Sequence, residues 1–500
     1  MKRHLHLACR LCLLGMFLFL SAMAAQAHLG LRIKTDPDGN VIVVGDAYDR
    51  GTLDDIFTIK YSATGVALWT NRFNGPGKSE DNAAAVAVDN HGNVFVLGTS
   101  IAGTNRAYVT LAYSGAGVPL WTNSYNAPGG WETPPRAGLA LGDNGNLFIT
   151  GNSSGGAPVS YTAIVFALSA AGQLLWTNTH PGAGRAVAVS GNGNVFALAG
   201  SENSCITLAY TGAGAPIWTN RCNALNLPMA MAVNTSGKIF VTGAAGGSAY
   251  DFATLAYSGA GVPLWTNWFS GPAYMEDYPM DLAVDDRGNV FVTGYTENPV
   301  WPPLEKNPRD YATLAYSGTG TLLWSRFHAG PYGSWDSPRG IAVDNSGNVV
   351  VTGTSAGDYV TIKYSGAGVA LWTNRYDGPT TNSADGAFAV AVDSSGNVFV
   401  TGISGSDCAT VAYSAAGAPL WTNRYRTGPG VIIQPLTNGS STINLKLYGT
   451  PNTTWYVERA LIINGPWTNL GQSVIGTNGL GFFLDAEPPP KGAFYRATAP

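Results

Sequence analysis

Two stretches of the sequence decide the fold: Asp281-Leu-Ala-Val-Asp-Asp-Arg-Gly-Asn-Val-Phe-Val-Thr-Gly294 and, after a variable segment, Asp310-Tyr-Ala-Thr-Leu-Ala-Tyr-Ser317. A third run, Leu322-Leu-Trp324, closes the unit. Apolar and polar residues alternate with a period of two in short runs, which indicates β-strands, and Gly, Asn, Asp and Ser between the runs indicate turns. Each unit is therefore expected to form four short strands.

The unit is repeated along almost the whole chain, and each copy ends on a tryptophan. The mean interval between these tryptophans is (421−69)/7, or about 50 residues. A period of roughly 40–50 residues with several strands per repeat is typical of a β-propeller. The eight tryptophans are Trp69, Trp121, Trp176, Trp218, Trp265, Trp324, Trp372 and Trp421.

A four-stranded sheet is too small to be stable alone, so neighbouring sheets must cover each other's apolar faces. The sequence after residue 27 shows no helical periodicity. We therefore predict an all-β fold over residues 28–427, an eight-bladed β-propeller of four-stranded antiparallel blades. The repeated tryptophans are expected to be largely buried between blades. Because no strand is missing at either end of the array, the last blade should come wholly from the last copy.

The repeat Ala-Val-Asp-x-x-Gly-Asn-Val-Phe-Val-Thr-Gly, followed by Ala-Thr-Leu-Ala-Tyr-Ser, resembles the bacterial β-propeller repeat family. Members of that family are secreted proteins, mostly without an assigned function. The first half is also similar to NHL-type repeats, and Gly-x-x-Leu-Trp is similar to the tryptophan-docking motif of pyrroloquinoline-quinone propellers. The resemblance covers about residues 28–427 and implies a propeller fold and export. Only the structural tryptophan motif of the quinoproteins matches, so we expect no cofactor.

The N-terminus has the pattern of a secretory signal. Lys2, Arg3 and Arg10 are followed by an apolar run over 11–20, and Ala25-Gln-Ala27 is a small-x-small cleavage site. The apolar run is too short for a comfortable membrane span. We predict a signal peptide over 1–27, a secreted or cell-surface protein, and no membrane insertion after signal cleavage.

Charge argues against nucleic acid as a partner. The signal peptide contains three of the 27 Lys and Arg residues, which leaves 27−3 = 24 against 31 Asp and Glu in the mature chain, a net charge of −7. The chain also has no basic cluster. Nucleic-acid binding normally leaves a basic patch or stripe.

Residues 428–500 leave the repeat. Strand-like runs such as Trp455-Tyr-Val-Glu458 and Gly481-Phe-Phe-Leu484 alternate with Gly-Asn turns and Pro488-Pro-Pro490. The pattern predicts a small C-terminal β-sandwich. It also resembles a short C-terminal module of secreted proteins from some environmental bacteria, and this resemblance implies no site residues.

Two cysteines replace aromatic residues within one copy of the repeat. Cys205 occupies the position of Tyr311 and Tyr359, and Cys222 occupies that of Tyr376. These positions belong to adjacent predicted strands, and export permits disulfides. A Cys205–Cys222 disulfide and a pair of buried thiols both remain open.

Candidate ligand residues gather in the connections of variable length, which share one face of the predicted disc. Sugars stack on flat rings and donate hydroxyl protons to carboxylates, so we select three tryptophans as stacking platforms and three acids as acceptors. The alternative for the aromatics is simple loop packing. The candidates are Trp131, Trp301, Trp335, Glu276, Asp277 and Asp336. The aspartates that recur at the start of the third strand are instead expected to bond turn backbone; they are Asp251, Asp310, Asp358 and Asp407.

We predict no metal site and no catalytic residues. The mature histidines do not cluster, and the Asp-x-x-Gly-Asn turns lack the alternating acids and terminal Glu of an EF-hand. The sequence therefore favours a non-catalytic extracellular binding protein or scaffold that meets carbohydrate or another cell-surface component. The alternative is a propeller enzyme acting on polysaccharide, either a hydrolase or a lyase.

Overall fold

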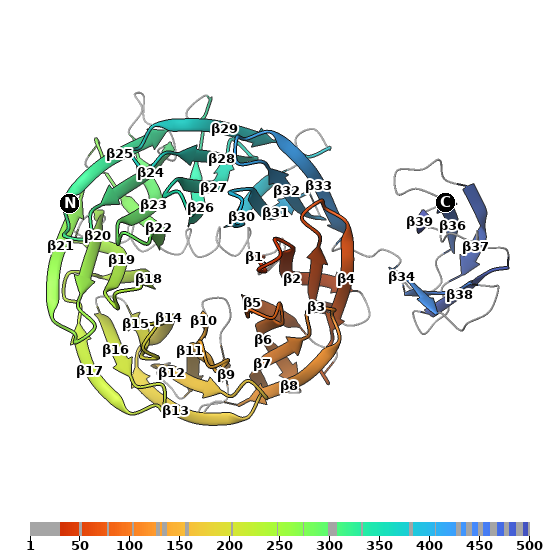
Figure 1. Cartoon of the computed structure of the whole chain (residues 1–500), viewed down its shortest axis with the longest axis horizontal. Helices are drawn as coiled ribbons and strands as arrows, with labels where there is room; N and C mark the ends of the chain where they lie inside the picture. The colour runs from red at the N-terminus through yellow and green to blue at the C-terminus, as the bar shows by residue number, and fades with distance from the viewer. Residues whose placement is uncertain are drawn as a thin grey trace, which may run out of the picture.

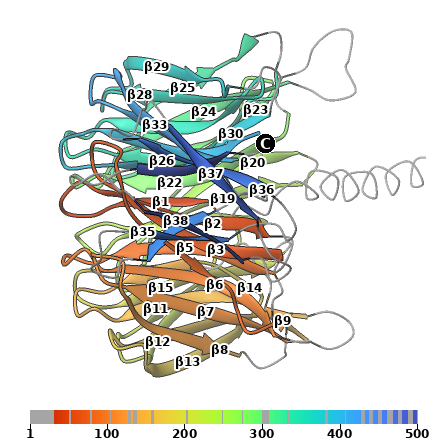
Figure 2. The same ribbon diagram turned by 90° about the vertical axis from the view of Figure 1, so that its right-hand side faces the viewer.

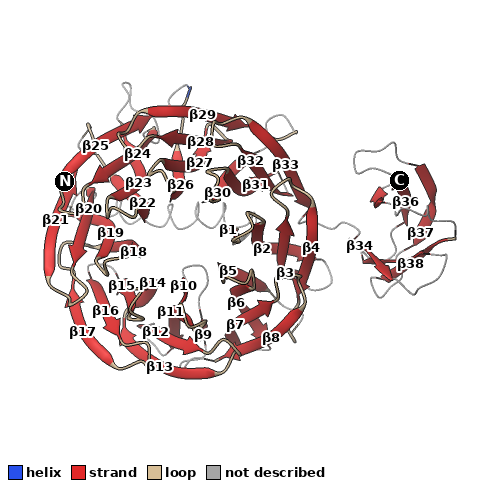
Figure 3. Cartoon of the chain, viewed as in Figure 1, coloured by secondary structure: helices blue, strands red, loops and turns tan. Residues whose placement is uncertain are grey.

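The computed structural model consists of β-strands joined by turns and loops (Figure 3). In the described part of the chain, no helix is long and apolar enough to cross a membrane. The predicted signal peptide lies outside the described residues. These are 31–498 without 50–52, 78–79, 103–104, 127–130, 133–137, 156–159, 202–203, 248, 274, 299–307, 332–333, 380–383, 406, 427–431, 437–442, 449–453, 461–467, 475–479 and 487–493.

Eight four-stranded antiparallel blades form a ring, as Figure 1 shows, and this confirms the predicted propeller. In each blade the first strand lies nearest the centre and the fourth lies at the outer rim. Blades one to four contain β1 (Arg32–Thr35), β2 (Val41–Asp49), β3 (Leu53–Tyr61), β4 (Ala67–Phe73); β5 (Asp81–Val88), β6 (Val94–Ala102), β7 (Asn105–Tyr113), β8 (Pro119–Tyr125); β10 (Gly138–Leu141), β11 (Leu147–Gly155), β12 (Ser160–Leu168), β13 (Leu174–Pro181); and β14 (Ala183–Val189), β15 (Val195–Ser201), β16 (Ser204–Tyr210), β17 (Pro216–Arg221).

The second half of the ring repeats this order. A short strand, β9 (Trp131–Glu132), pairs with β7 and β11 and so joins blades two and three. Blades five to eight contain β18 (Leu227–Val233), β19 (Ile239–Gly246), β20 (Tyr250–Tyr257), β21 (Pro263–Phe269); β22 (Asp277–Val284), β23 (Val290–Glu297), β24 (Arg309–Tyr316), β25 (Leu322–His328); β26 (Ser337–Val343), β27 (Val349–Ser355), β28 (Asp358–Tyr364), β29 (Ala370–Tyr376); and β30 (Asp385–Val392), β31 (Val398–Ser404), β32 (Asp407–Tyr413), β33 (Pro419–Arg426).

The apolar core lies between blades. Phe240 of blade five packs in one cluster with Val290 and Leu314 of blade six, and all three are fully buried. The alternation of the Val-Phe-Val runs explains this, because residues one position apart point to opposite faces of a strand and so reach opposite neighbouring blades.

Each repeated tryptophan docks on the next blade. The Trp265 indole N–H donates to Gly318 O at 3.3 Å, and Asn267 Nδ2 donates to Gly320 O at 2.6 Å. Gly320 has a φ of +88°, and a Cβ added there would lie 2.7 Å from the Trp265 ring. Only glycine fits both the backbone conformation and the space. Equivalent indole bonds start from Trp69, Trp121, Trp176, Trp218, Trp324, Trp372 and Trp421.

The last of these bonds closes the ring. The Trp421 N–H donates to Ala63 O at 2.9 Å, and Asn423 Nδ2 donates to Gly65 O at 2.7 Å. All four strands of the eighth blade come from the last copy of the repeat, as predicted. The ring is therefore closed by side-chain contacts rather than by a blade made from both ends of the chain.

The repeated tryptophans differ in how completely they are buried, and Trp324 is the most buried at 7% exposed. The other seven are half-buried. The physical reason is their place at the rim. One face of each ring lies against the glycine of the neighbouring turn, while the other side of the rim has no further strand to cover it.

The antiparallel order gives the ring two different sides, and the edge-on view in Figure 2 shows the strands running across its thickness. Turns between strands one and two and between strands three and four share the turn side. The other connections share the loop side. On the turn side Asp36 Oδ1 accepts the backbone N–H groups of Asp38 and Asn40 at 3.0 and 2.8 Å. The Asp-x-x-Gly-Asn pattern thus serves the turn itself.

After the propeller, two three-stranded sheets follow. One has the order β34-β35-β38 and the other has β37-β36-β39. Arg459 Nη1 lies 2.9 Å from Asp485 Oδ2, and the Tyr495 hydroxyl donates to the same oxygen at 2.6 Å. The strands are β34 (Ile432–Leu436), β35 (Ile443–Tyr448), β36 (Thr454–Ala460), β37 (Thr468–Val474), β38 (Leu480–Asp485) and β39 (Phe494–Thr498).

Candidate functional site

Four aromatic rings and one guanidinium group stand in a row on the loop side of blades five to seven. We call this row the aromatic ladder. Each member lies at the loop end of a strand or in the connection beside it. Its members are Tyr250 of β20, Tyr278 of β22, Tyr295 of β23, Arg309 of β24 and Trp335, which precedes β26.

Consecutive members of the ladder are in contact. The ring centroids of Tyr250 and Tyr278 are 5.2 Å apart, and those of Tyr278 and Tyr295 are 5.4 Å apart. Arg309 Cζ lies 4.1 Å from the Tyr295 ring centroid and 4.4 Å from that of Trp335. The guanidinium therefore makes cation–π contacts with both rings.

Arg309 is fixed by an ion pair and by its backbone. Its Nε and Nη2 atoms donate to Glu297 Oε1 at 3.1 and 2.8 Å. Its backbone N–H donates to Ser334 O at 3.3 Å, and its carbonyl accepts the Asp336 N–H at 3.0 Å. These bonds tie blade six to the segment that carries Trp335. The tryptophan is thus held in place before any ligand arrives.

Trp335 is the most exposed ring of the ladder. Tyr295 is buried, Tyr250 and Tyr278 are half-buried, and Trp335 is 42% exposed. Glu276 is half-buried, and its backbone carbonyl accepts the Glu297 N–H at 3.1 Å. Burial, reinforced by the Glu297 charge, raises the pKa of Glu276 above its usual value. Trp335 and Glu276 are the two sequence candidates that this site presents to solvent.

Asp277 and Asp336 are fully buried. Asp277 accepts the backbone N–H of Gly271. Asp336 accepts that of Gly330 and also the Ser334 hydroxyl, the latter at 2.6 Å. Burial raises the pKa of Asp277 to about 6. Both carboxylates hold the connection that leads into their own blade, so this burial does not fit the surface role expected for them.

The other two tryptophan candidates cannot be placed in the ladder. The backbone of Trp131 pairs with Arg106 of β7 and Ser154 of β11, and its side chain is not described. Trp301 lies outside the described residues. For both, a role in ligand binding stays a prediction.

Sequence reasoning missed Tyr295, Arg309 and Glu297. One signal was present. Tyr295 follows the glycine of its second strand, where other copies carry smaller residues such as Thr354 and Ile403. Tyr295 is therefore larger than the residues at the equivalent position of other copies, and this difference indicates that its blade is packed differently there. Arg309 and Glu297 had no equivalent signal, because they belong to the variable connection.

Two of the recurring aspartates of the third strand pair with arginines, and the expected bonds to turn backbone stay a prediction. Asp358 pairs with Arg375 at 2.5 Å, and Asp407 pairs with Arg424 at 3.1 Å. The arginine lies three residues after the docking tryptophan, diagonally opposite the aspartate on the fourth strand. Blades five and six carry Trp268 and Phe327 at that position, 56% and 43% exposed.

One group of acids has the geometry of a cation site. Carboxylate oxygens of Asp358, Asp377 and Asp385 lie within 4.8 Å of one another. Asp358 is already paired with Arg375, and Asp385 accepts the Gly378 N–H at 2.7 Å. The protein therefore uses two of the three carboxylates itself, and we assign no metal to them.

Comparisons with known proteins found only distant structural similarity. No protein family and no curated protein matches the sequence. Sqt1 from Chaetomium thermophilum is similar with a TM-score of 0.44 and 13% identity, over 79% of this chain and 95% of that one. The β-propeller domain of the Trilobed protease from Pyrococcus furiosus has a TM-score of 0.38 and 7% identity, over 63% and 89%. A protein from Lactobacillus plantarum has a TM-score of 0.38 and 12% identity, over 78% and 99%.

Proposed function

We propose that the protein is exported and acts as a non-catalytic binding protein whose ligand, a carbohydrate chain, meets the loop side of blades five to seven. The observation that carries this proposal is the exposed Trp335 ring, which Arg309 fixes from one side. A fixed indole offers a large contact area at little conformational cost, since little of its mobility is left to lose on binding.

The surroundings of Trp335 suit a polar, uncharged ligand with many hydroxyl groups. Glu276 offers a carboxylate that can accept hydrogen bonds from hydroxyl groups, and burial raises its pKa. The Arg309 charge is already matched by Glu297 at 2.8 Å. An anionic ligand would have to compete with that ion pair, which favours a neutral sugar over a charged one.

The rival function, cleavage of polysaccharide, needs two carboxylates on opposite sides of the scissile bond. Among the described residues of the ladder region, Glu297 is engaged by Arg309, and Asp277 is engaged by Gly271. Two of the carboxylates beside the ladder therefore already have partners within the protein. The arrangement therefore supports binding better than catalysis.

A glycan array followed by calorimetry tests the proposal. The Trp335→Ala variant should bind the selected glycan at least about tenfold more weakly, a loss of about 1.4 kcal/mol. Trp268→Ala is the matched control, because Trp268 is even more exposed but lies on the outer strand β21. Equal affinity of wild type and Trp335→Ala would remove the site from the ladder. Release of reducing ends by the wild type, lost in Glu276→Gln, would instead establish the enzyme.

Export is tested separately. Mass measurement of the mature protein from the culture medium or cell surface should give an N-terminus at His28, directly after the predicted signal peptide. An intact Met1 on protein that stays inside the cell would contradict export and leave the ladder experiment unaffected.

A further inference from the structure

Blade four differs from the others at one pair of facing positions. Blade seven has Tyr359 and Tyr376 there, with ring centroids 5.2 Å apart. Blade four has Cys205 and Cys222, both buried free thiols, and the Cys222 N–H donates to Cys205 O at 2.7 Å. The bridge that the sequence left open is not formed in this structure and stays a prediction. Two thiols in place of two rings leave volume unfilled.

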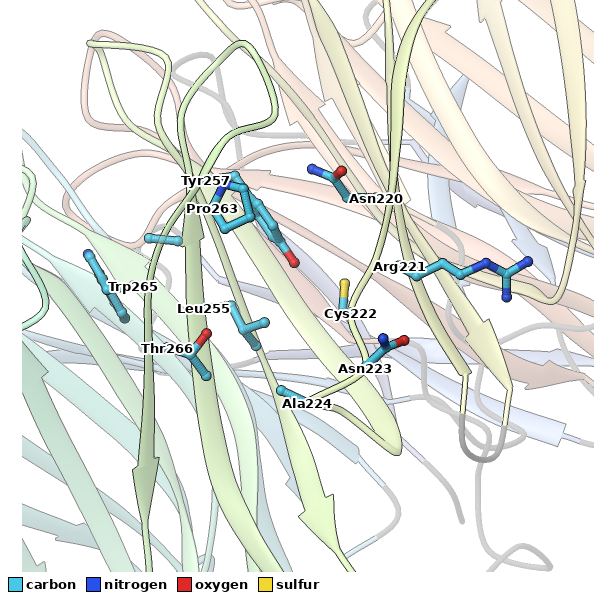
Figure 4. A pocket seen from close by; sticks show the side chains of 11 residues that line it. Asn220, Arg221, Cys222, Asn223, Ala224, Leu255, Tyr257, Pro263, Trp265 and Thr266 are labelled. Atoms are coloured by element: carbon cyan, nitrogen blue, oxygen red, sulfur yellow. The ribbon is translucent and has the colours of Figure 1, made fainter.

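A crevice of about 230 Å³ lies between blades four and five, and Cys222 is part of its lining. Figure 4 shows Cys222 on its wall, across from Tyr257 and beside Asn223. Thr266 also contributes to the lining. The crevice is smaller than the roughly 300–1,000 Å³ of sites for drug-sized ligands. It therefore admits a small molecule and excludes a protein loop.

Three groups surround the sulfur of Cys222. Thr207 Oγ1 lies 3.4 Å from it, and the Cys205 thiol and the Tyr257 hydroxyl lie close enough to affect its pKa. Donors that point at a sulfur stabilise its thiolate form, which is the nucleophile. The neighbouring Cys205 thiol has the largest of these effects, and together they lower the pKa of Cys222 in spite of burial. Burial raises the pKa of Cys205, and the bond to Cys222 raises it further.

Cys408 provides an internal comparison. It occupies the Cys205 position in blade eight, and its partner across the strands is Tyr425 instead of a second cysteine. Burial raises the pKa of Cys408 to about 12. Cys408, which has the same backbone position but no second cysteine beside it, therefore stays protonated.

We propose that Cys222 and Cys205 form a thiol–disulfide exchange site, in which Cys222 attacks a small organic disulfide that enters the crevice and Cys205 resolves the product. This inference is independent of the proposed carbohydrate site. The roles follow from geometry, because Cys222 borders the crevice and receives the donors, whereas Cys205 lies behind it on β16.

The chemistry takes two steps. The Cys222 thiolate attacks one sulfur of RS–SR, the S–S bond breaks, and RS⁻ leaves and takes a proton from water. The sulfur of Cys205 then attacks the Cys222 sulfur of the mixed disulfide, its proton passes to the second RS⁻, and the Cys205–Cys222 bond forms. The two cysteines lose two electrons, and RS–SR is reduced to two RSH.

The test uses the reduced full-length protein and 2-hydroxyethyl disulfide, with the cysteines mapped by mass after alkylation. Wild type should form the Cys205–Cys222 bridge and release two equivalents of thiol. Cys205→Ser should stop at a mixed disulfide on Cys222. Cys222→Ser should leave Cys205 unmodified, and Cys408 should react at least about tenfold more slowly than Cys222 in wild type and in Cys205→Ser.

A milder variant guards against loss of the fold. Tyr257→Phe removes one donor and keeps the ring, so its melting temperature should stay close to that of wild type. The pH at which Cys222 reacts at half its maximal rate should be higher in Tyr257→Phe than in wild type, because one group that lowers the pKa of Cys222 is lost. Modification of Cys205 in Cys222→Ser, equal rates for Cys222 and Cys408, or an unchanged pH profile in Tyr257→Phe would each overturn the proposal.

Discussion

On the turn side of the ring, Trp265 places its indole N–H on Gly318 O, and every other blade makes the equivalent bond. On the loop side, Trp335 is held by Arg309, and among the described residues that arrangement occurs once. Both tryptophans are fixed by a neighbouring blade. The Trp265 contact is repeated because it joins each blade to the next. The Trp335 contact occurs in one part of the ring and is not needed to hold the blades together.

Carboxylates show the same division. Asp36 on the turn side pairs with Lys60 at 2.7 Å and also accepts backbone N–H groups of its own turn. Asp277 on the loop side is equally buried, and its hydrogen bond comes from the Gly271 N–H rather than from a cation. A difference in partners at similar burial should produce opposite effects of pH on stability.

The largest expected effect is on the rim tryptophans. Trp265→Ala removes the inter-blade bond and the ring that covers Gly320, and we expect a loss of about 2–4 kcal/mol in the free energy of unfolding. Trp268→Ala, three residues along the same strand, should cost under about 1 kcal/mol because that ring is exposed. Denaturant unfolding of both variants checks this. A similar loss in both would show that the docking bond contributes little.

Period and turn chemistry were sufficient to predict the ring. Eight copies of one pattern, with glycine where a turn needs positive φ, determine eight blades, and the last blade follows because no strand is missing. The extent of burial was not predictable from the pattern. Trp265 and Trp324 occupy equivalent repeat positions, yet Trp324 is more deeply buried, and it is the one of the two with a guanidinium nearby, with Arg326 Cζ 6.0 Å from its ring.

The candidate site was predicted only in part, for a physical reason. Trp335 and Glu276 could be selected by residue type and by their place in variable connections. The partners that fix Trp335, Arg309 and Glu297, come from a different blade, and no local pattern encodes a contact between blades in a non-repeated segment. Asp277 looked like a surface acid because its neighbours are polar. Its burial depends on how the connection folds back over β22.

The second prediction uses pH to separate the two sides. Burial opposes ionisation of Asp36, but hydrogen bonds from Lys60 and Asn40 outweigh it and lower its pKa. A lowered pKa in the folded state adds stability above the unfolded pKa of about 3.9, and this stability is lost as the pH falls through the folded value. Asp36→Asn should therefore lower the free energy of unfolding at pH 7 by about 1–2 kcal/mol. Below about pH 4 the stability of this variant should depend less on pH than that of wild type.

Asp277 should behave in the opposite way. Burial raises its pKa to about 6, so it favours the fold below the unfolded pKa and loses that contribution as the pH rises through about 6. Asp277→Asn keeps an acceptor for the Gly271 N–H and removes the titration. As the pH rises from 4 to 7, the melting temperature of wild type should fall relative to that of Asp277→Asn. Parallel curves for Asp277→Asn and wild type would mean that the carboxylate stays ionised in the fold throughout.

The smallest expected effect concerns the one blade whose rim departs from the repeat. Arg326 replaces the usual asparagine, and its Nε donates to Gly368 O at 2.6 Å, where Asn267 of blade five donates to Gly320 O at the same distance. Arg326→Asn should preserve this bond and change stability by less than about 0.5 kcal/mol. It also removes the guanidinium from the Trp324 ring, so the exposure of that tryptophan should rise towards that of Trp265 and quenching of its fluorescence by iodide should increase. A loss above about 1 kcal/mol would show that blade six depends on the arginine itself, and the turn side would then be less uniform than its repeated bonds indicate.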